Sequence, residues 1–173
     1  MRPELVLKPN EGLGELSFGM LPVDVRDRLG LPDTTDEHSG PWPEVCFGWQ
    51  YKRLGLDVFF QRPRLLWKPT DPFRLLMFTS THAHLNLWGR RIMKLPQAEV
   101  FAFLAHHGQY SSERLEPLGK NFTTVRIPDL NLDFEFRKGR LFLCQWRWSQ
   151  ADRRRLQPEV RGEASQCSGG PES

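Results

Sequence analysis

Two segments of eight residues, 54–61 and 130–137, share one pattern and constrain the fold more than any other part of the chain. In each segment apolar residues occupy every second position, which is the period of a strand with one buried face. The apolar positions are Leu54, Leu56, Val58 and Phe60 in the first segment and Leu130, Leu132, Phe134 and Phe136 in the second. An aspartate stands at the same place in the opposite row of each segment, Asp57 and Asp133. The match predicts an internal duplication.

The neighbouring residues extend this duplication. A Leu-Pro pair opens an amphipathic segment at 21–29 and another at 95–107, and a glycine follows each, which is typical of a short helix docked on a sheet. Strands are predicted at 45–52, 54–61 and 74–84 (with a possible extension to Trp88) after the first helix, and at 112–115, 122–127, 130–137 and 140–148 after the second. The predicted fold class is therefore α+β: two tandem repeats, each a short helix followed by about three antiparallel strands, with the helices packed on one sheet face.

The length of 173 residues, with 39% hydrophobic and 12% aromatic residues, fits a single globular domain. We place this domain at residues 1–149, with its two repeats at about 12–88 and 92–149. Residues 1–11 are expected to be a lead-in with one edge strand at 5–7, followed by a turn at 12–14. Residues 150–173 lose apolar periodicity and are predicted to be a disordered C-terminal tail.

Composition excludes several kinds of partner. The net charge is only +3, from 24 basic and 21 acidic residues, so no nucleic-acid partner is expected. No window approaches the roughly 20 apolar residues of a membrane span, and the first residues lack the apolar run of a signal peptide. The three cysteines have no C-x-x-C spacing. A cytoplasmic protein with reduced thiols, no metal and no cofactor is the resulting expectation, and its oligomeric state stays open.

Few residues suggest catalysis. His82 and His84 are two positions apart on a predicted strand and could offer two imidazoles to a metal, but no acidic residue or cysteine lies at a ligand spacing nearby. Asp57 and Asp133 could act as a pair of carboxylates, although such rows are usually solvated strand faces. The sequence has no phosphate-binding glycine loop, nucleophile elbow or H-E-x-x-H helix. We therefore expect a protein that is not an enzyme.

Protein binding is the function that the remaining features favour. Residues 62–73 form a long connection with three prolines, whereas the second repeat has the tight turn Lys138-Gly139 in the same place. Aromatic side chains in loops are frequent anchors for partners, although Trp42, which stands between two prolines, could equally cover the edge of the core. The candidate partner-binding residues are Trp42, Arg64, Trp67 and Lys68 in the loops and Asp57, Phe59, Asp133, Glu135 and Arg147 in the strands.

The spacing of Phe18-Gly-Met-Leu-Pro22, Val25 and Leu29-Gly-Leu-Pro32, followed by an aromatic strand, resembles the opening of modules in three kinds of small bacterial protein. These are the tandem-module beta-lactamase inhibitor proteins, the outer-membrane assembly lipoproteins, and immunity proteins that neutralise polymorphic toxins. The chain lacks the signal peptide and lipidated cysteine of the lipoproteins and the paired cysteines of the secreted inhibitors. Among the three, the resemblance therefore implies an intracellular immunity or inhibitor protein.

The sequence thus predicts a non-enzymatic cytoplasmic protein-binding module, in particular an immunity or inhibitor protein with a toxin as partner. The alternative is a small-molecule-binding or hydrolytic domain that uses Asp57, Asp133 and His82 or His84 in a cleft between the repeats. A purely architectural role in a larger assembly is a third hypothesis. A convergent pocket holding these side chains would favour the alternative, and separation of the two aspartates on an open strand face would count against it.

Overall fold

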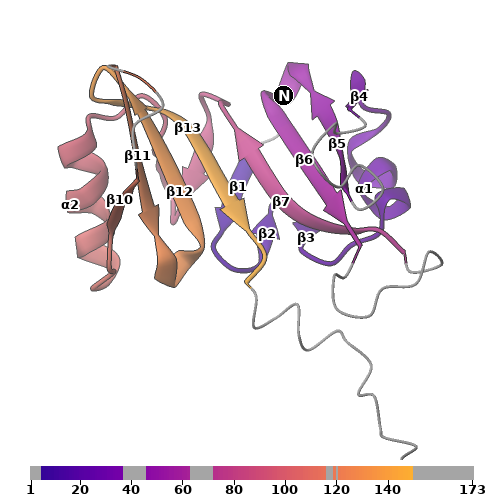
Figure 1. Ribbon diagram of the computed structural model, residues 1–173, viewed down its shortest axis with the longest axis horizontal. Coiled ribbons are helices and arrows are strands. Elements are labelled where there is room, and N and C mark those ends of the chain that lie inside the picture. The colour runs from indigo at the N-terminus through magenta and orange to yellow at the C-terminus, as the bar shows by residue number, and fades with distance from the viewer. Residues whose placement is uncertain (1–4, 37–45, 63–71, 116–118, 120, 150–173) are drawn as a thin grey trace, which may run out of the picture.

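The computed structural model describes residues 5–36, 46–62, 72–115, 119 and 121–149. One large antiparallel sheet dominates the fold of these residues. The strand order in this sheet is β10-β11-β12-β13-β7-β6-β5-β4 (Figure 1). Its strands are β4 (Thr34–Asp36), β5 (Cys46–Tyr51), β6 (Leu56–Gln61), β7 (Arg74–Ser80), β10 (Glu113–Leu115), β11 (Phe122–Ile127), β12 (Leu132–Arg137) and β13 (Arg140–Arg147). With the helices α1 (Pro22–Leu29) and α2 (Gln97–His107), this confirms the α+β class and the antiparallel sheet.

A second, smaller sheet packs on one face of the large sheet and was not predicted. Its order is β3-β2-β1-β8-β9, from strands β1 (Leu5–Lys8), β2 (Gly12–Leu13), β3 (Leu16–Ser17), β8 (Leu85–Leu87) and β9 (Arg90–Arg91). The expected edge strand at 5–7 is therefore the middle strand of this sheet, paired in parallel with β8. The expected turn at 12–14 contains β2, which belongs to a short hairpin with β3.

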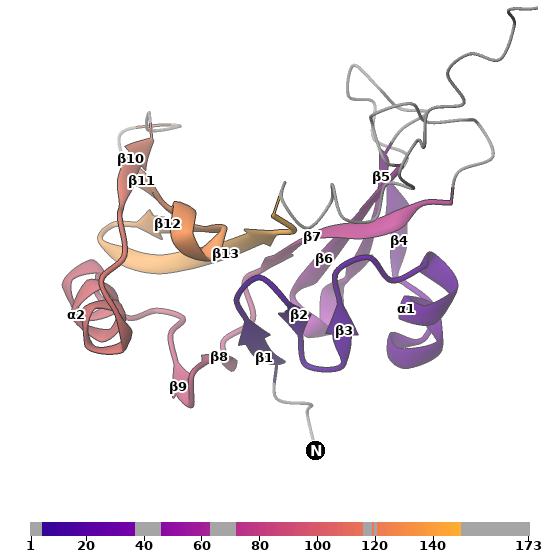
Figure 2. The same ribbon diagram turned by 90° about the horizontal axis from the view of Figure 1, so that it is seen from below.

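The helices and the small sheet lie on the same side of the large sheet (Figure 2). The apolar rows of β6 and β12 point to this side, and Val58, Phe60, Leu132 and Phe134 are completely buried. Backbone hydrogen bonds fix the chain that leads into each helix: the Leu75 N–H donates to the Met20 carbonyl, and the Leu141 N–H donates to the Leu95 carbonyl, at 2.8 and 2.9 Å. The core therefore lies between the large sheet on one side and the helices and the small sheet on the other.

One order of elements occurs twice along the chain. A helix is followed by a short edge strand, a strand, a 3-10 turn and two further strands, first from α1 to β7 and again from α2 to β13. The turns are η1 (Lys52–Leu54) and η2 (Pro128–Leu130), and each ends at a left-handed residue, Gly55 or Asn131, with φ of 52° and 51°. The pairing shifts by one residue after Phe59 in the first series and after Glu135 in the second.

Several predicted boundaries need correction. The strand expected at 74–84 ends at Ser80, because the Ser80 hydroxyl donates to the Gly55 carbonyl and accepts the His82 N–H, which turns the chain out of the sheet. The predicted strands at 54–61 and 130–137 begin two residues later, at Leu56 and Leu132, since the 3-10 turns occupy their first residues. The edge strand β4 lies in a segment for which no strand was predicted.

Candidate binding surface

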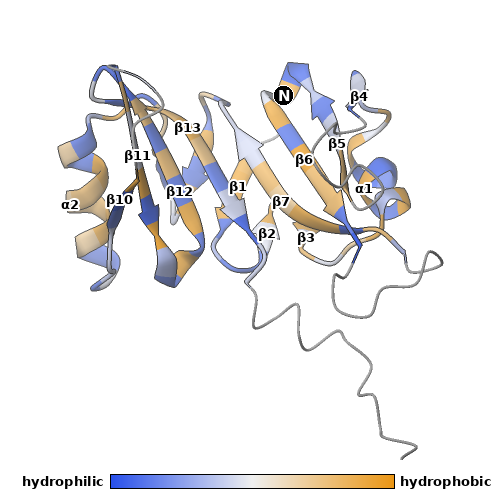
Figure 3. Ribbon diagram, viewed as in Figure 1, coloured by the Kyte–Doolittle hydropathy of each residue, from blue (hydrophilic) through white to orange (hydrophobic). Residues whose placement is uncertain are grey.

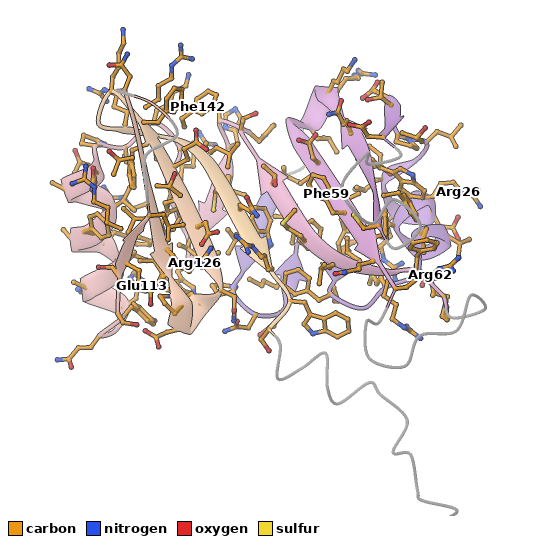
Figure 4. The ribbon with its side chains drawn as sticks, viewed as in Figure 1. Arg26, Phe59, Arg62, Glu113, Arg126 and Phe142 are labelled. Carbon is orange, nitrogen blue, oxygen red and sulfur yellow. The ribbon has the colours of Figure 1, made fainter. Side chains whose placement is uncertain are left out.

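The face of the large sheet opposite the helices is the candidate functional surface, and we call it the open face. No helix or strand of the described residues covers it, and it faces the reader in Figures 1 and 4. The alternation along each strand sends apolar side chains to the core and the others to this face, as the change from orange to blue along β6, β12 and β13 shows (Figure 3).

Register places eight residues of the open face in one line across all eight strands, and we call this line the polar row. Each member is paired directly with the next: Thr34, Gln50, Asp57, Thr79, Gln145, Asp133, Arg126 and Glu113. The centre of the row is the Thr79–Gln145 pair, where β7 meets β13. Asp57 and Asp133 stand one strand to either side of this centre.

Asp133 is held by two arginines. Arg126, directly opposite on β11, donates from Nε to Oδ1 at 2.9 Å and from Nη2 to Oδ2 at 3.3 Å. Arg147, from β13, donates from Nη2 to Oδ2 of the same carboxylate. The hydrogen bond and the negative charge of Asp133 raise the pKa of Arg126. The side chain of Asp133 is only 11% exposed, so this ion pair compensates a largely buried carboxylate.

Asp57 has quite different surroundings. Its neighbour on β5 is Gln50, whose Oε1 accepts the Thr34 hydroxyl at 2.8 Å, and its neighbour on β7 is Thr79. Within the described residues no arginine or lysine forms an ion pair with Asp57. Partial burial raises the pKa of its carboxyl group. Of the two aspartates in this row, one is therefore compensated by arginines and the other has no described cation.

Apolar side chains flank the polar row. Phe59 on β6 is half-buried and lies opposite Met77 of β7, whose sulfur accepts the Gln145 Nε2 hydrogen at 2.8 Å. In the other half, Phe142 is the extra residue of the β13 bulge and is 40% exposed. The guanidinium of Arg137 lies 5.7 Å from the ring centroids of both Phe142 and Phe122. Figure 4 labels Phe59 and Phe142 in the two halves of the sheet.

The five strand residues predicted as binding candidates all belong to the open face. Asp57 and Phe59 lie together on β6, Asp133 and Glu135 lie together on β12, and Arg147 contacts Asp133 from β13. The loop candidates Trp42, Arg64, Trp67 and Lys68 lie outside the described residues, as does the predicted tail at 150–173. The structure thus joins the strand candidates in one surface, although the two aspartates do not touch.

The structure does not bring together the residues of the alternative hypothesis, Asp57, Asp133 and His82 or His84. Asp57 and Asp133 are three strand intervals apart, roughly 14 Å at about 4.8 Å per interval. His82 is buried beyond the end of β7, and its Nδ1 accepts the His84 N–H at 3.2 Å, which occupies one of the nitrogens that a metal would need. In the described part of the chain no group of three or more His, Cys, Asp or Glu residues could hold a metal ion.

A pocket of about 650 Å³ lies away from the open face, between α2 and β11. Its lining mixes apolar side chains with the polar segment after the helix and includes Phe101, Leu104, Tyr110, Ser111 and Ile127. None of the predicted site residues lines it. It therefore adds no chemistry to the open face.

Sequence reasoning missed Arg126, Thr79, Gln145, Met77 and Phe142 as members of the surface. Their positions depend on which strands are neighbours, and the pairing of β13 with β7 joins residues more than sixty positions apart. A usable signal existed for Arg126, since a basic residue on the strand before Asp133 suits a cross-strand ion pair.

Comparison with protein-family models, with curated proteins and with solved structures found no match to the chain. Among the described residues, neither α1 nor α2 has the length and apolar character that would let it cross a membrane.

Proposed function

We propose that the chain is a non-enzymatic protein-binding module of the cytoplasm, and that the open face contacts its partner. The observation that supports this most is the polar row, which runs across eight strands with apolar side chains beside it and no described element above it. Ion pairs and exposed aromatic side chains on one surface are typical of protein interfaces. The buried free thiol of Cys144 is compatible with a reducing compartment.

We also propose that the scaffold arose by duplication of one module. Support comes from the repeated order of elements, from the left-handed residues Gly55 and Asn131 after the two 3-10 turns, and from the bulges after Phe59 and Glu135. A duplicated module gives a long continuous sheet from a short unit. Such a sheet offers a broad surface for one protein partner.

Inhibition of a toxin is the form of binding that we propose for this surface. The resemblance of residues 18–32 to the modules of bacterial immunity proteins supports it, as does the scarcity of catalytic groups on the open face. An immunity protein acts by occupying a surface of the toxin and needs no reaction of its own. The partner would then be retained in a fixed one-to-one ratio.

Affinity capture from the native host tests the proposal. The bait is the chain tagged at its C-terminus, compared with Thr79→Arg at the centre of the polar row and with Leu31→Arg as a charge-matched control. Leu31 is 80% exposed and lies two residues after α1, which is on the other side of the sheet. We expect one stoichiometric protein with the wild type and the control, and its loss with Thr79→Arg. Equal retention by both variants, or nothing above background, would refute the proposed function.

A further inference from the structure

The two aspartates of the polar row occupy the same position in their strands but differ in the cations around them. Each is the second residue of its strand, β6 or β12, and each is paired with one residue on each of the two neighbouring strands. Two arginines contact Asp133. Arg126 is paired directly with Asp133 on the neighbouring strand β11. Arg147 lies on the other neighbouring strand, β13, two residues after Gln145, which is the residue paired with Asp133 there.

The corresponding positions around Asp57 carry no charge. Gln50 is the residue opposite on β5, and Thr81 is the residue two places beyond Thr79. Neither side chain can neutralise a carboxylate, and the Gln50 oxygen already accepts the Thr34 hydroxyl. The fold therefore shows at Asp133 how a carboxylate at this position is compensated, and among the described residues Asp57 has no such compensation.

Dehydration makes a cation at Asp57 favourable. Partial burial raises the pKa of Asp57, which means that the ionised form is poorly solvated in the folded protein. A carboxylate in such a place gains more from an opposite charge than one in bulk water does. The polar row as a whole has three carboxylates, Asp57, Asp133 and Glu113, and only one guanidinium, that of Arg126. Arg147 beside the row is already engaged with Asp133.

The side chains beside Asp57 suit a long cationic residue. Phe59 lies two residues along the same strand and therefore on the same face, and Met77 lies opposite Phe59. The aliphatic stem of a lysine or arginine packs well on such apolar atoms while its charged end reaches a carboxylate nearby. On the other side of Phe59, its paired residue on β5 is Gly48, which has no side chain.

We propose that Asp57 is the contact point for a lysine or arginine side chain of the partner protein, which takes the place that Arg126 and Arg147 take at Asp133. This inference rests on the proposed function, because it assigns the chemistry of the partner at the same open face. The basic residue of the partner completes the charge pattern of the polar row. Its neighbours in the partner cover Phe59 and Met77.

Two variants of the full chain and one control test the assignment. Asp57→Asn removes the negative charge, and Gln50→Arg installs beside Asp57 the cation that Asp133 already has. Asp27→Asn is the control, since Asp27 is an exposed acid on α1 at the other side of the sheet. The protein recovered by affinity capture is titrated with each chain by calorimetry at low and high salt.

We expect both open-face variants to lower the affinity at least about tenfold, because truncating one partner of a desolvated charge pair at an interface has effects of this size or larger. Asp27→Asn should stay within about twofold of the wild type, since exposed charges outside an interface change affinity little. Thermal unfolding should show Gln50→Arg at least as stable as the wild type, which separates loss of binding from loss of folding.

The possible failures are distinguishable. If the captured protein binds Asp57→Asn as tightly as the wild type, the assignment of Asp57 is wrong while the proposed function stands. If no protein is captured, both are wrong. If the wild type instead forms a dimer that Gln50→Arg breaks, the occupant of the open face is a second copy of this chain, and the assignment to a partner protein is contradicted.

Discussion

At the scale of single residues, surroundings decide what each carboxylate of the polar row contributes. Asp133 is buried and accepts three hydrogen bonds from two arginines, whereas Asp57 is only partly buried and has no described cation. The first carboxylate holds three strands together through its charge. The second loses some solvation without a described cation to offset the loss, so it does not stabilise the fold in the way that Asp133 does.

Replacing Asp133 with asparagine should therefore destabilise the protein, by about 1 to 3 kcal/mol, because it leaves the guanidinium groups of Arg126 and Arg147 without their carboxylate. Asp57→Asn is the matched control and should leave the free energy of unfolding unchanged or slightly higher. Urea denaturation at neutral pH measures both. Equal losses in the two variants would contradict the distinction between the two sites.

The pKa values of Asp57 and Asp129 are shifted in opposite directions. Burial raises the pKa of Asp57 above its ordinary value of 3.8. The hydroxyl and N–H of Ser111, both 2.8 Å from Asp129 Oδ2, lower the pKa of Asp129 below that value. As the pH falls, carbon NMR of the carboxyl groups should show Asp57 taking up its proton before Asp129. The reverse order would contradict the surroundings described for both residues.

The directions of these two pKa shifts determine how each aspartate makes the stability of the protein depend on pH. A raised folded pKa means that Asp57 favours the folded state below its unfolded pKa and that this contribution is lost as the pH rises through the folded value. A lowered folded pKa means that Asp129 favours folding above its unfolded pKa and that this contribution is lost as the pH falls through the folded value. Removing Asp57 should thus flatten the pH dependence of unfolding between the unfolded and the folded pKa values of this residue.

At the scale of elements, period-2 strands were predictable and the short strands were not. The expected strand at 122–127 agrees with β11 residue for residue, and the other strands of the large sheet that were predicted differ by a few residues at their ends. Strands of two residues, such as β2 and β3, have no periodicity to detect. The parallel pair β1 and β8 joins segments about eighty positions apart, which local patterns cannot reveal.

The candidate site was predictable in its parts and not in its arrangement. Alternation alone puts Asp57 and Phe59 on one strand face and Asp133 and Glu135 on another. Their union in one surface depends on β7 pairing with β13, which nothing in either segment encodes. The absence of a cleft around the two aspartates follows from the same pairing, because two strands stand between them.

The hairpin of β2 and β3 depends on a glycine whose place no larger residue can take. A Cβ added at Gly12, where φ is 154°, would meet the Leu16 carbonyl oxygen at 2.0 Å, whereas one added at Gly14, where φ is 57°, would have nothing within 4 Å. Gly14→Ala should cost about 1 to 2 kcal/mol, the price of a left-handed alanine. Gly12→Ala should cost clearly more, because backbone must move. Thermal unfolding compares them, and equal losses would show that the hairpin tolerates the displacement.

At the scale of the whole molecule, the pairing of β13 with β7 makes two series of elements into one sheet. Trp146 and Phe78 face each other across this pairing with ring centroids 5.2 Å apart and are both completely buried. The core is continuous on both sides of the junction. The protein should therefore unfold as one cooperative unit, although its elements suggest two modules.

Trp146→Ala should test this cooperativity, since a cavity of this size typically costs about 3 to 5 kcal/mol. Hydrogen exchange should then accelerate equally in β6, in the first series, and in β12, in the second. Trp146→Phe is the control and should keep most of the stability. Acceleration confined to β12 and β13 would show that the two series unfold independently.

The central claim is that the open face contacts a protein partner, and hydroxyl-radical footprinting of the chain alone and with the captured protein tests it most directly. Met77 and Phe142 report on the open face, and Leu31 and Val23, which are 80% and 43% exposed, report on the helix side. We predict that the partner protects Met77 and Phe142 from oxidation and leaves Leu31 and Val23 unchanged. Protection of Leu31 and Val23 with Met77 and Phe142 unaffected would contradict the account.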